Sequence, residues 1–272
     1  VTIGMWWSPG MEDGGMRQGI SNMISTAGGV DSGAADADLS ALRAQLEPLE
    51  PQQCLQWALD RYGAGFAMTT SFGIQSSVLL HMLSRLPGGE AVPVIWVDTG
   101  YLPPETYRYS ETLCKRLGSH LVVAQSSVSP ARMEALHGRL WETGREEDMD
   151  FYLRLRKVEP LEEALDQAKV RCWASGVRRG QTDLRNTMTV LDPIRDRLSL
   201  RPLLGWTNRD VFYYMQKHEL PQHPLFDQGY STVGDWHSSA PDGLGGEGRS
   251  TRFGGQRQEC GIHVPGVMGD GI

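Results

Sequence analysis

The chain has 272 residues, 40% of them hydrophobic, and a formal net charge of −7 at pH 7. This size and composition suit one α/β domain with or without appendages, and the negative charge argues against general nucleic-acid binding. No run approaches about eighteen apolar residues, and no basic region followed by an apolar core opens the chain, so neither a membrane span nor a secretory signal is predicted.

Four cysteines are widely spaced, with no Cys-x-x-Cys pair among them: Cys54, Cys114, Cys172 and Cys260. This spacing argues against a disulfide framework, a zinc ribbon and a cysteine-ligated iron–sulfur cluster. It indicates a reducing, cytoplasmic location.

Residues 1–37 are rich in Gly, Ser and Met with little periodicity, so we interpret them as a mobile N-terminal extension. Within them, Ala27–Ser32 resembles the phosphate-binding loop of ATP pyrophosphatases. Such a loop needs a buried strand before it and an apolar helix after it. Ser21–Thr26 makes a poor strand and Gly33–Asp38 a poor helix, so we interpret this loop as non-functional.

Residues 38–234 alternate apolar runs with helical periodicity and form the predicted nucleotide-binding α/β domain. Strands are predicted, in chain order, at Phe66–Thr69, Val92–Val97, Leu121–Val123, Cys172–Gly176, Val190–Ile194 and Leu198–Leu200. Helices are predicted at Leu39–Leu46, Gln52–Tyr62, Gln75–Leu86 and Pro104–Leu117, in short pieces between Pro130 and Ala168, and from Thr207 or Asn208 to His218. This alternation predicts a parallel sheet with helices on both faces.

Two strand ends carry candidate nucleotide ligands. Ser71, Phe72 and Gly73 form a tight turn before a helix, where backbone N–H groups and the helix dipole favour a phosphate. The next strand ends at Asp98, Thr99 and Gly100, at the sheet edge where open α/β sheets bind ligands. Asp98 is a candidate acceptor for a ribose hydroxyl or an adenine amine; the alternative is that it caps its own turn.

A third strand end carries an arginine loop that includes Gly176, Arg178, Arg179 and Gln181. The planar guanidinium group binds phosphate or sulfate through two parallel hydrogen bonds, so these arginines indicate a small anionic ligand. Lys157 is a further candidate anchor, although a salt bridge on a helix would explain it equally well.

Cys260 differs in context from the other cysteines, which we interpret as buried small hydrophobes. Its neighbours are not core residues; Arg249, Arg252 and Arg257 precede it, and His263 follows three positions later. Cationic neighbours lower the pKa of a thiol and favour the nucleophilic thiolate. After Leu220 prolines and glycines recur without periodicity, so residues 235–272 are predicted to be a flexible segment that carries this thiol.

Together these stretches resemble the phosphoadenylyl-sulfate (PAPS) reductases of assimilatory sulfate reduction, which feeds cysteine biosynthesis, and the related adenylyl-sulfate (APS) reductases. The motifs that carry the resemblance follow in family order: Thr70–Gln75, Asp98–Tyr101, Lys157–Pro160, Gly176–Gln181, His223–Leu225, Gly229–Asp235 and Glu259–His263. The resemblance implies a Rossmann-like adenine-nucleotide α-hydrolase fold and, as a family expectation, a homodimer.

The resemblance also implies a mechanism. The matching cysteine, Cys260, would attack the sulfur of PAPS and give an S-sulfocysteine and adenosine 3′,5′-bisphosphate. Thioredoxin, or glutaredoxin in its place, would then release sulfite. Lys157, Arg252 and His263 would surround the sulfo group, and the remaining candidates would bind the nucleotide. Residues from about position 235 onward would order according to the bound ligand.

Departures from the family pattern bear on cofactor and substrate. The iron–sulfur APS reductases carry a Cys-Cys pair before the lysine motif and a Cys-x-x-Cys after the Gly-Tyr run. Here those places hold Tyr152–Leu153 and Asp235–Ser238, so no cluster and no other cofactor is expected and PAPS is favoured as substrate. A cluster-free APS reductase remains an alternative.

Two other functions stay open. An ATP pyrophosphatase or adenylyltransferase of the same fold would use the phosphate turn alone and would not need Cys260. A metal-binding or nucleotide-sensing module would use the group His218, His223, Asp227 and His237, although that spacing fits no standard zinc pattern.

Overall fold

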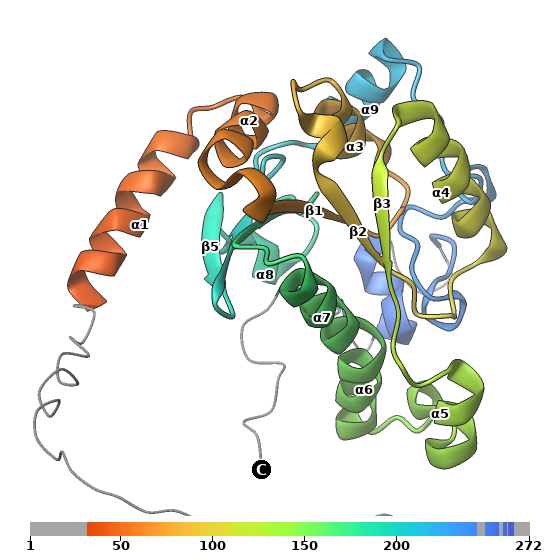
Figure 1. Cartoon of the computed structure of the whole chain (residues 1–272). Helices are drawn as coiled ribbons and strands as arrows, with labels where there is room; N and C mark the ends of the chain where they lie inside the picture. The colour runs from red at the N-terminus through yellow and green to blue at the C-terminus, as the bar shows by residue number, and fades with distance from the viewer. Residues whose placement is uncertain (1–31, 244–247, 256–257, 260, 264–272) are drawn as a thin grey trace, which may run out of the picture. The chain divides into compact units, whose positions relative to one another are not determined.

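The computed structural model describes residues 32–243, 248–255, 258–259 and 261–263. The chain divides into two compact units, Val1–Asp38 and Leu39–Ile272. The second unit contains one six-stranded sheet in the order β3-β2-β1-β4-β6-β5 (Figure 1). The strands are β1 (Phe66–Thr70), β2 (Pro93–Val97), β3 (His120–Ala124), β4 (Cys172–Ala174), β5 (Leu191–Ile194) and β6 (Arg197–Leu200). Neighbouring strands run parallel except β5, which is antiparallel to β6.

The α-helices in the described part of the chain are α1 (Ser32–Leu46), α2 (Pro51–Tyr62), α3 (Ser77–Ser84), α4 (Pro104–Leu117), α5 (Pro130–His137), α6 (Glu146–Leu153), α7 (Glu159–Gln167), α8 (Asp183–Asn186) and α9 (Asn208–Lys217). A π-helical turn, Arg154–Val158, joins α6 to α7. The α/β class with a mainly parallel sheet is therefore confirmed. No helix among the described residues combines the length and the apolar character needed to cross a membrane.

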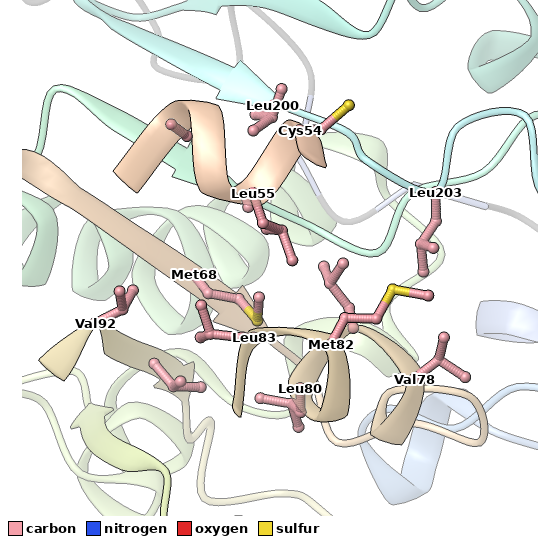
Figure 2. Close-up of a cluster of buried hydrophobic side chains, with 14 of the residues drawn as sticks. Cys54, Leu55, Met68, Val78, Leu80, Met82, Leu83, Val92, Leu200 and Leu203 are labelled. Carbon is pink, nitrogen blue, oxygen red and sulfur yellow. The ribbon is translucent and has the colours of Figure 1, made fainter. Parts of the chain in front are cut away.

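Alternate side chains of the central strands enter two different cores, as a pleated strand requires. Phe66 and Met68 of β1 pack with apolar residues of α2, α3, α4 and α9, whereas Ala67 between them packs with α7. Figure 2 shows the first core, with Leu55 of α2 and Met82 and Leu83 of α3 around Met68. Because helices cover both faces of the sheet, the central strands are continuous apolar runs in the sequence.

Local sequence signals set several element ends. Pro104 lies at the first turn of α4, and Gly118 ends the helix with a left-handed φ of 64°. Thr207 caps α9 by accepting from the Asp210 amide, while the Asp210 carboxylate accepts from the Thr207 amide. Both helices therefore fall where the sequence predicts them.

Two predicted segments differ from the structure. The prediction of a poor helix at Gly33–Asp38 was wrong, because α1 begins at Ser32. Ala34, Ala35 and Ala37 have the highest intrinsic helix propensity, which outweighs the single glycine. The neighbouring phosphate-loop look-alike, residues 27–32, falls almost entirely outside the described residues. The stretch after Leu220, where no periodicity predicts a helix, also contains short 3-10 helices at Phe226–Gln228, Trp236–Ser238 and Gly248–Gly255.

Candidate active site

A cavity of about 240 Å³ opens at the carboxyl ends of β1, β2 and β4. Parallel strands present their carboxyl ends at one edge of a sheet, and the loops that follow them form the walls. The structure brings most of the predicted ligand residues to this lining: Ser71, Gly73, Thr99, Lys157, Gly176, Arg178, Gln181, Arg252 and His263. Residues far apart in the sequence therefore meet at one site.

The turn after β1 is held by its own side chains. Phe72 has a positive φ of 46° and its ring is fully buried, edge-on to Trp96 with 4.9 Å between ring centroids. Packing fixes this uncommon backbone conformation. Thr70 accepts a hydrogen bond from the Phe72 amide, and the Ser76 hydroxyl donates to the carbonyl of Gly73. Phe72 thus shapes the turn from the core, and Ser71 and Gly73 line the cavity.

Asp98 is held by hydrogen bonds within the protein at the end of β2, and its predicted contact with a ligand stays a prediction. Its Oδ1 accepts from the Tyr107 hydroxyl at 2.6 Å and from the Gly100 amide at 2.8 Å, and its Oδ2 accepts from Gln125 at 2.7 Å. Neither Asp98 nor Gly100 is among the cavity-lining residues. The alternative interpretation, in which Asp98 caps its own turn, agrees with this geometry.

The arginine loop divides between two environments. Arg178 is buried and lines the cavity, where its guanidinium donates to Gln75 and to Asn208 at 2.9 Å. Burial, followed by the charge of Arg185, lowers the pKa of Arg178 to about 10. Arg179 lies outside the lining with its side chain 46% exposed, 4.0 Å from Glu47. Of the two arginines predicted to bind an anion, Arg178 therefore lies at the cavity and Arg179 lies at the surface.

Lys157 lies on the π-helical turn and forms a buried ion pair with Asp235, with 2.7 Å between Nζ and Oδ2. The carboxylate also accepts from the Thr99 hydroxyl at 2.6 Å and from the Tyr152 hydroxyl at 3.1 Å. Burial alone would raise the pKa of Asp235, but Lys157 and Thr99 together hold it well below its usual range. Lys157 therefore forms a salt bridge from a helical turn, as one interpretation predicts, and also lines the cavity, as the other requires.

The C-terminal segment closes one side of the cavity with Arg249, Arg252, Ile262 and His263. The ring of His263 stacks on Trp173 with 5.4 Å between centroids, and burial followed by the charge of Arg185 lowers the pKa of His263 well below its usual value. Cys260, the predicted nucleophile, lies outside the described residues.

The other cysteines match their interpretation as core thiols. Cys54 and Cys172 are buried and Cys114 is partly buried. Burial raises the pKa of Cys54 and Cys114 to about 11 and that of Cys172 to about 12, which disfavours the thiolate.

The histidines of the metal-site alternative occupy separate places. The ring of His218 packs at a tilt against the rings of His81 and Tyr214. His223 hydrogen-bonds with Thr106, and His237 hydrogen-bonds with Tyr152. Among the described residues, no group of three or more His, Cys, Asp or Glu side chains could hold a metal ion.

Sequence reasoning did not single out Asp235, Gln75 or Asn208 as site residues. Asp235 and Gln75 stand inside two of the quoted motifs, so the motifs were the available signal. The sequence indicates only that Asn208 is a helix-cap candidate, because its contact with Arg178 arises from tertiary packing.

The family model of the phosphoadenosine phosphosulfate reductase domain matches residues 65–241. A phosphoadenosine 5′-phosphosulfate reductase of Synechococcus is 52% identical over 227 residues, which cover 83% of this chain and 97% of that protein.

Two solved structures share the architecture. A PAPS reductase from Candida auris, crystallised as a phosphate complex, superposes with a TM-score of 0.65 at 27% identity over 80% of this chain and all of that one. The FMN adenylyltransferase of Candida glabrata in complex with ATP reaches a TM-score of 0.53 at 14% identity over 71% of this chain and 61% of that one, which shows the fold alone. The predicted Rossmann-like fold is confirmed.

Proposed function

The chain belongs to the phosphoadenosine phosphosulfate reductase family, and we propose that it reduces 3′-phosphoadenylyl sulfate (PAPS) to sulfite and adenosine 3′,5′-bisphosphate. The observation that carries the proposal is the cavity at the carboxyl edge of the sheet, where the cationic side chains of Lys157, Arg178 and Arg252 belong to the lining. Both the sulfo group and the leaving phosphate of PAPS are anionic, so a thiolate can approach them only where fixed cations offset the repulsion.

In the proposed first step the Cys260 thiolate attacks the sulfur of the sulfo group. A bond forms between Sγ and that sulfur, and the bond from sulfur to the phosphate oxygen breaks. The leaving adenosine 3′,5′-bisphosphate takes the electron pair. Lys157, already held by Asp235 at 2.7 Å, would stabilise the negative charge on the leaving oxygens.

In the second step a thioredoxin thiolate attacks Sγ of the S-sulfocysteine. Sulfite leaves with the electron pair of the broken bond, and the second thioredoxin thiol resolves the mixed disulfide. Thioredoxin supplies two electrons and returns as its disulfide. Four further expectations stay predictions: glutaredoxin in place of thioredoxin, a homodimer, a cytoplasmic location and a place in assimilatory sulfate reduction.

The absence of an iron–sulfur cluster is part of the proposal. Tyr152 and Asp235 stand at the two places where the iron–sulfur relatives carry their cysteine motifs, and their side chains hydrogen-bond to each other at 3.1 Å. Phenol and carboxylate oxygens offer no thiolate to a cluster. This pairing supports PAPS over APS as substrate, on the family pattern described above.

The decisive experiment measures sulfite release with PAPS or APS and thioredoxin, for the wild type and Cys260→Ser. We expect turnover with PAPS, a preference for PAPS over APS, and loss of sulfite release in the variant. Mass spectrometry without thioredoxin should find a sulfo adduct on Cys260. Full activity in Cys260→Ser would refute the mechanism, whereas a preference for APS would change only the substrate.

A further inference from the structure

We propose that the Arg185–Glu259 ion pair is a positioning device that docks the C-terminal segment beside the cavity, and that Arg185 serves this anchor rather than binding a substrate phosphate. This inference rests on the proposed function, in which Cys260 is the nucleophile. Glu259 directly precedes Cys260 in the sequence, so an anchor on Glu259 restricts the thiol more closely than any other charged side chain can.

The pair has the geometry of a specific contact. Two of the three guanidinium nitrogens of Arg185 donate to the two carboxylate oxygens of Glu259, Nε to Oε1 at 2.8 Å and Nη2 to Oε2 at 2.9 Å. The Thr182 hydroxyl donates to the same Oε1 at 2.8 Å. Two parallel bonds fix direction as well as distance, which a single contact between flexible side chains does not.

The pair is also shielded from solvent, with side-chain exposures of 6% for Arg185 and 12% for Glu259. Arg249 lies 3.5 Å from the same carboxylate. Burial raises the pKa of Glu259, but Arg185 and Arg249 more than offset this, so the carboxylate stays ionised near neutral pH. A shielded pair of this kind is screened little by salt and holds its geometry.

The body of the protein presents Arg185 in a fixed position. Thr182 caps α8 by accepting from the Arg185 amide, and Arg185 Nη1 donates to Gln181 at 2.5 Å. Because Gln181 in turn accepts from the Arg178 amide, the anchor is joined to the arginine loop of the cavity. The anchor therefore connects the segment that carries the nucleophile to the wall that would hold the nucleotide.

Weaker contacts hold the segment on either side. The Arg249 Nε donates to the Gln258 carbonyl at 3.0 Å, and Arg195 donates to the Ile262 carbonyl at 3.1 Å. Both use the backbone and would tolerate any side chain there. The Glu259 contact alone among these specifies a residue type, which makes it the testable element of the docking.

The test compares Glu259→Gln, Arg185→Gln, the double variant and the charge swap Arg185→Glu with Glu259→Arg. Single-turnover release of adenosine 3′,5′-bisphosphate, with enzyme in excess and no thioredoxin, should slow by roughly tenfold to a hundredfold in each single variant, because small misplacements of a reacting group cost about this much. The double variant should be no slower than the singles, the swap should recover part of the rate, and bisphosphate affinity should stay within about twofold of wild type.

A matched control is Asp166→Asn. Asp166 is an exposed residue of α7 that pairs with Arg197 of β6, and its loss should leave the rate unchanged. Amide hydrogen exchange over residues 258–263 supplies a readout independent of activity, and should be faster in both single variants. Wild-type rate and exchange in Glu259→Gln would overturn the anchor. Weakened bisphosphate binding in Arg185→Gln, with Glu259→Gln normal, would make Arg185 a phosphate ligand. If the wild type transfers no sulfo group, the proposed function fails, and the exchange measurement still decides the anchor.

Discussion

At the scale of single residues, the ion pair with Asp235 allows the charged ammonium group of Lys157 to be buried beside the cavity. A lysine ammonium is expensive to remove from water unless a counter-ion and hydrogen bonds replace its hydration. Asp235 supplies the charge, and Thr99 and Tyr152 satisfy the oxygen atoms of that carboxylate. The pair is neutral overall but aims a positive group at the site.

Replacing Asp235 with Asn should reveal the cost of breaking this pair. The substitution keeps the shape but leaves a buried ammonium group without its counter-ion, so we expect the free energy of unfolding to fall by about 3 to 5 kcal/mol. Urea denaturation measures this value. Asp166→Asn, at an exposed carboxylate, should change it by less than about 1 kcal/mol. A loss below about 1 kcal/mol in Asp235→Asn would contradict the role assigned to the pair.

At the scale of elements, the loop that ends at Asp235 and the 3-10 helix Gly248–Gly255 meet at the cavity wall. Gly234 permits this meeting, because a Cβ atom there would clash with the guanidinium of Arg252. Arg252 is buried and lines the cavity. A glycine in one element thus sets the position of a cation in another.

Gly234→Ala should therefore affect ligand binding more than folding. The clash involves the end of a flexible side chain, which can move aside, so we expect unfolding free energy to change by no more than about 1 kcal/mol. Displacement of Arg252 should weaken the binding of PAPS about tenfold, or about 1.4 kcal/mol, by calorimetry in a Cys260→Ser background that cannot transfer the sulfo group. Gly205→Ala is the matched control, since a Cβ atom there meets nothing within 4 Å. Equal affinities for PAPS in the two variants would show that Arg252 does not bind the sulfo group.

At the scale of the whole molecule, several buried groups have their pKa lowered by folding. Burial lowers the pKa of His223 and of His237 to about 4 each, and Asp235 and Glu259 are also shifted downward. The unfolded chain, in which histidine titrates near 6.5, therefore binds more protons than the folded one as pH falls. The contribution of the two histidines to the free energy of unfolding is fully present above about pH 6.5 and is lost progressively toward pH 4.

The pH dependence can be measured directly. We expect the free energy of unfolding to fall between pH 7 and pH 5 by about 2 kcal/mol for each of the two histidines. Urea titrations at both pH values, for the wild type and His223→Asn, check this. The variant should be less stable at pH 7 but should lose about 2 kcal/mol less on acidification. An equal fall in the free energy of unfolding between pH 7 and pH 5 in the two proteins would show that His223 does not contribute to the acid sensitivity.

The sequence by itself determined the strands of the sheet and most of the helices beside it, because their signals are local. The ends of α4 follow from Pro104 and Gly118, and the buried strands follow from continuous apolar runs. The order of motifs was also enough for the family. The turn at Ser71–Gly73 and the arginine at position 178 reached the cavity as expected, since strand ends in a parallel sheet share one edge.

Only the tertiary structure decided which polar side chain faces the cavity and which serves the protein itself. Asp98 and Arg179 stand in the same motifs as Thr99 and Arg178, yet one caps its turn and the other lies at the surface. The partners that settle these roles, such as Asp235 for Lys157 and Glu259 for Arg185, come from positions about 75 residues away in the sequence. Side-chain direction and charge pairing depend on such distant neighbours, and no local pattern carries them.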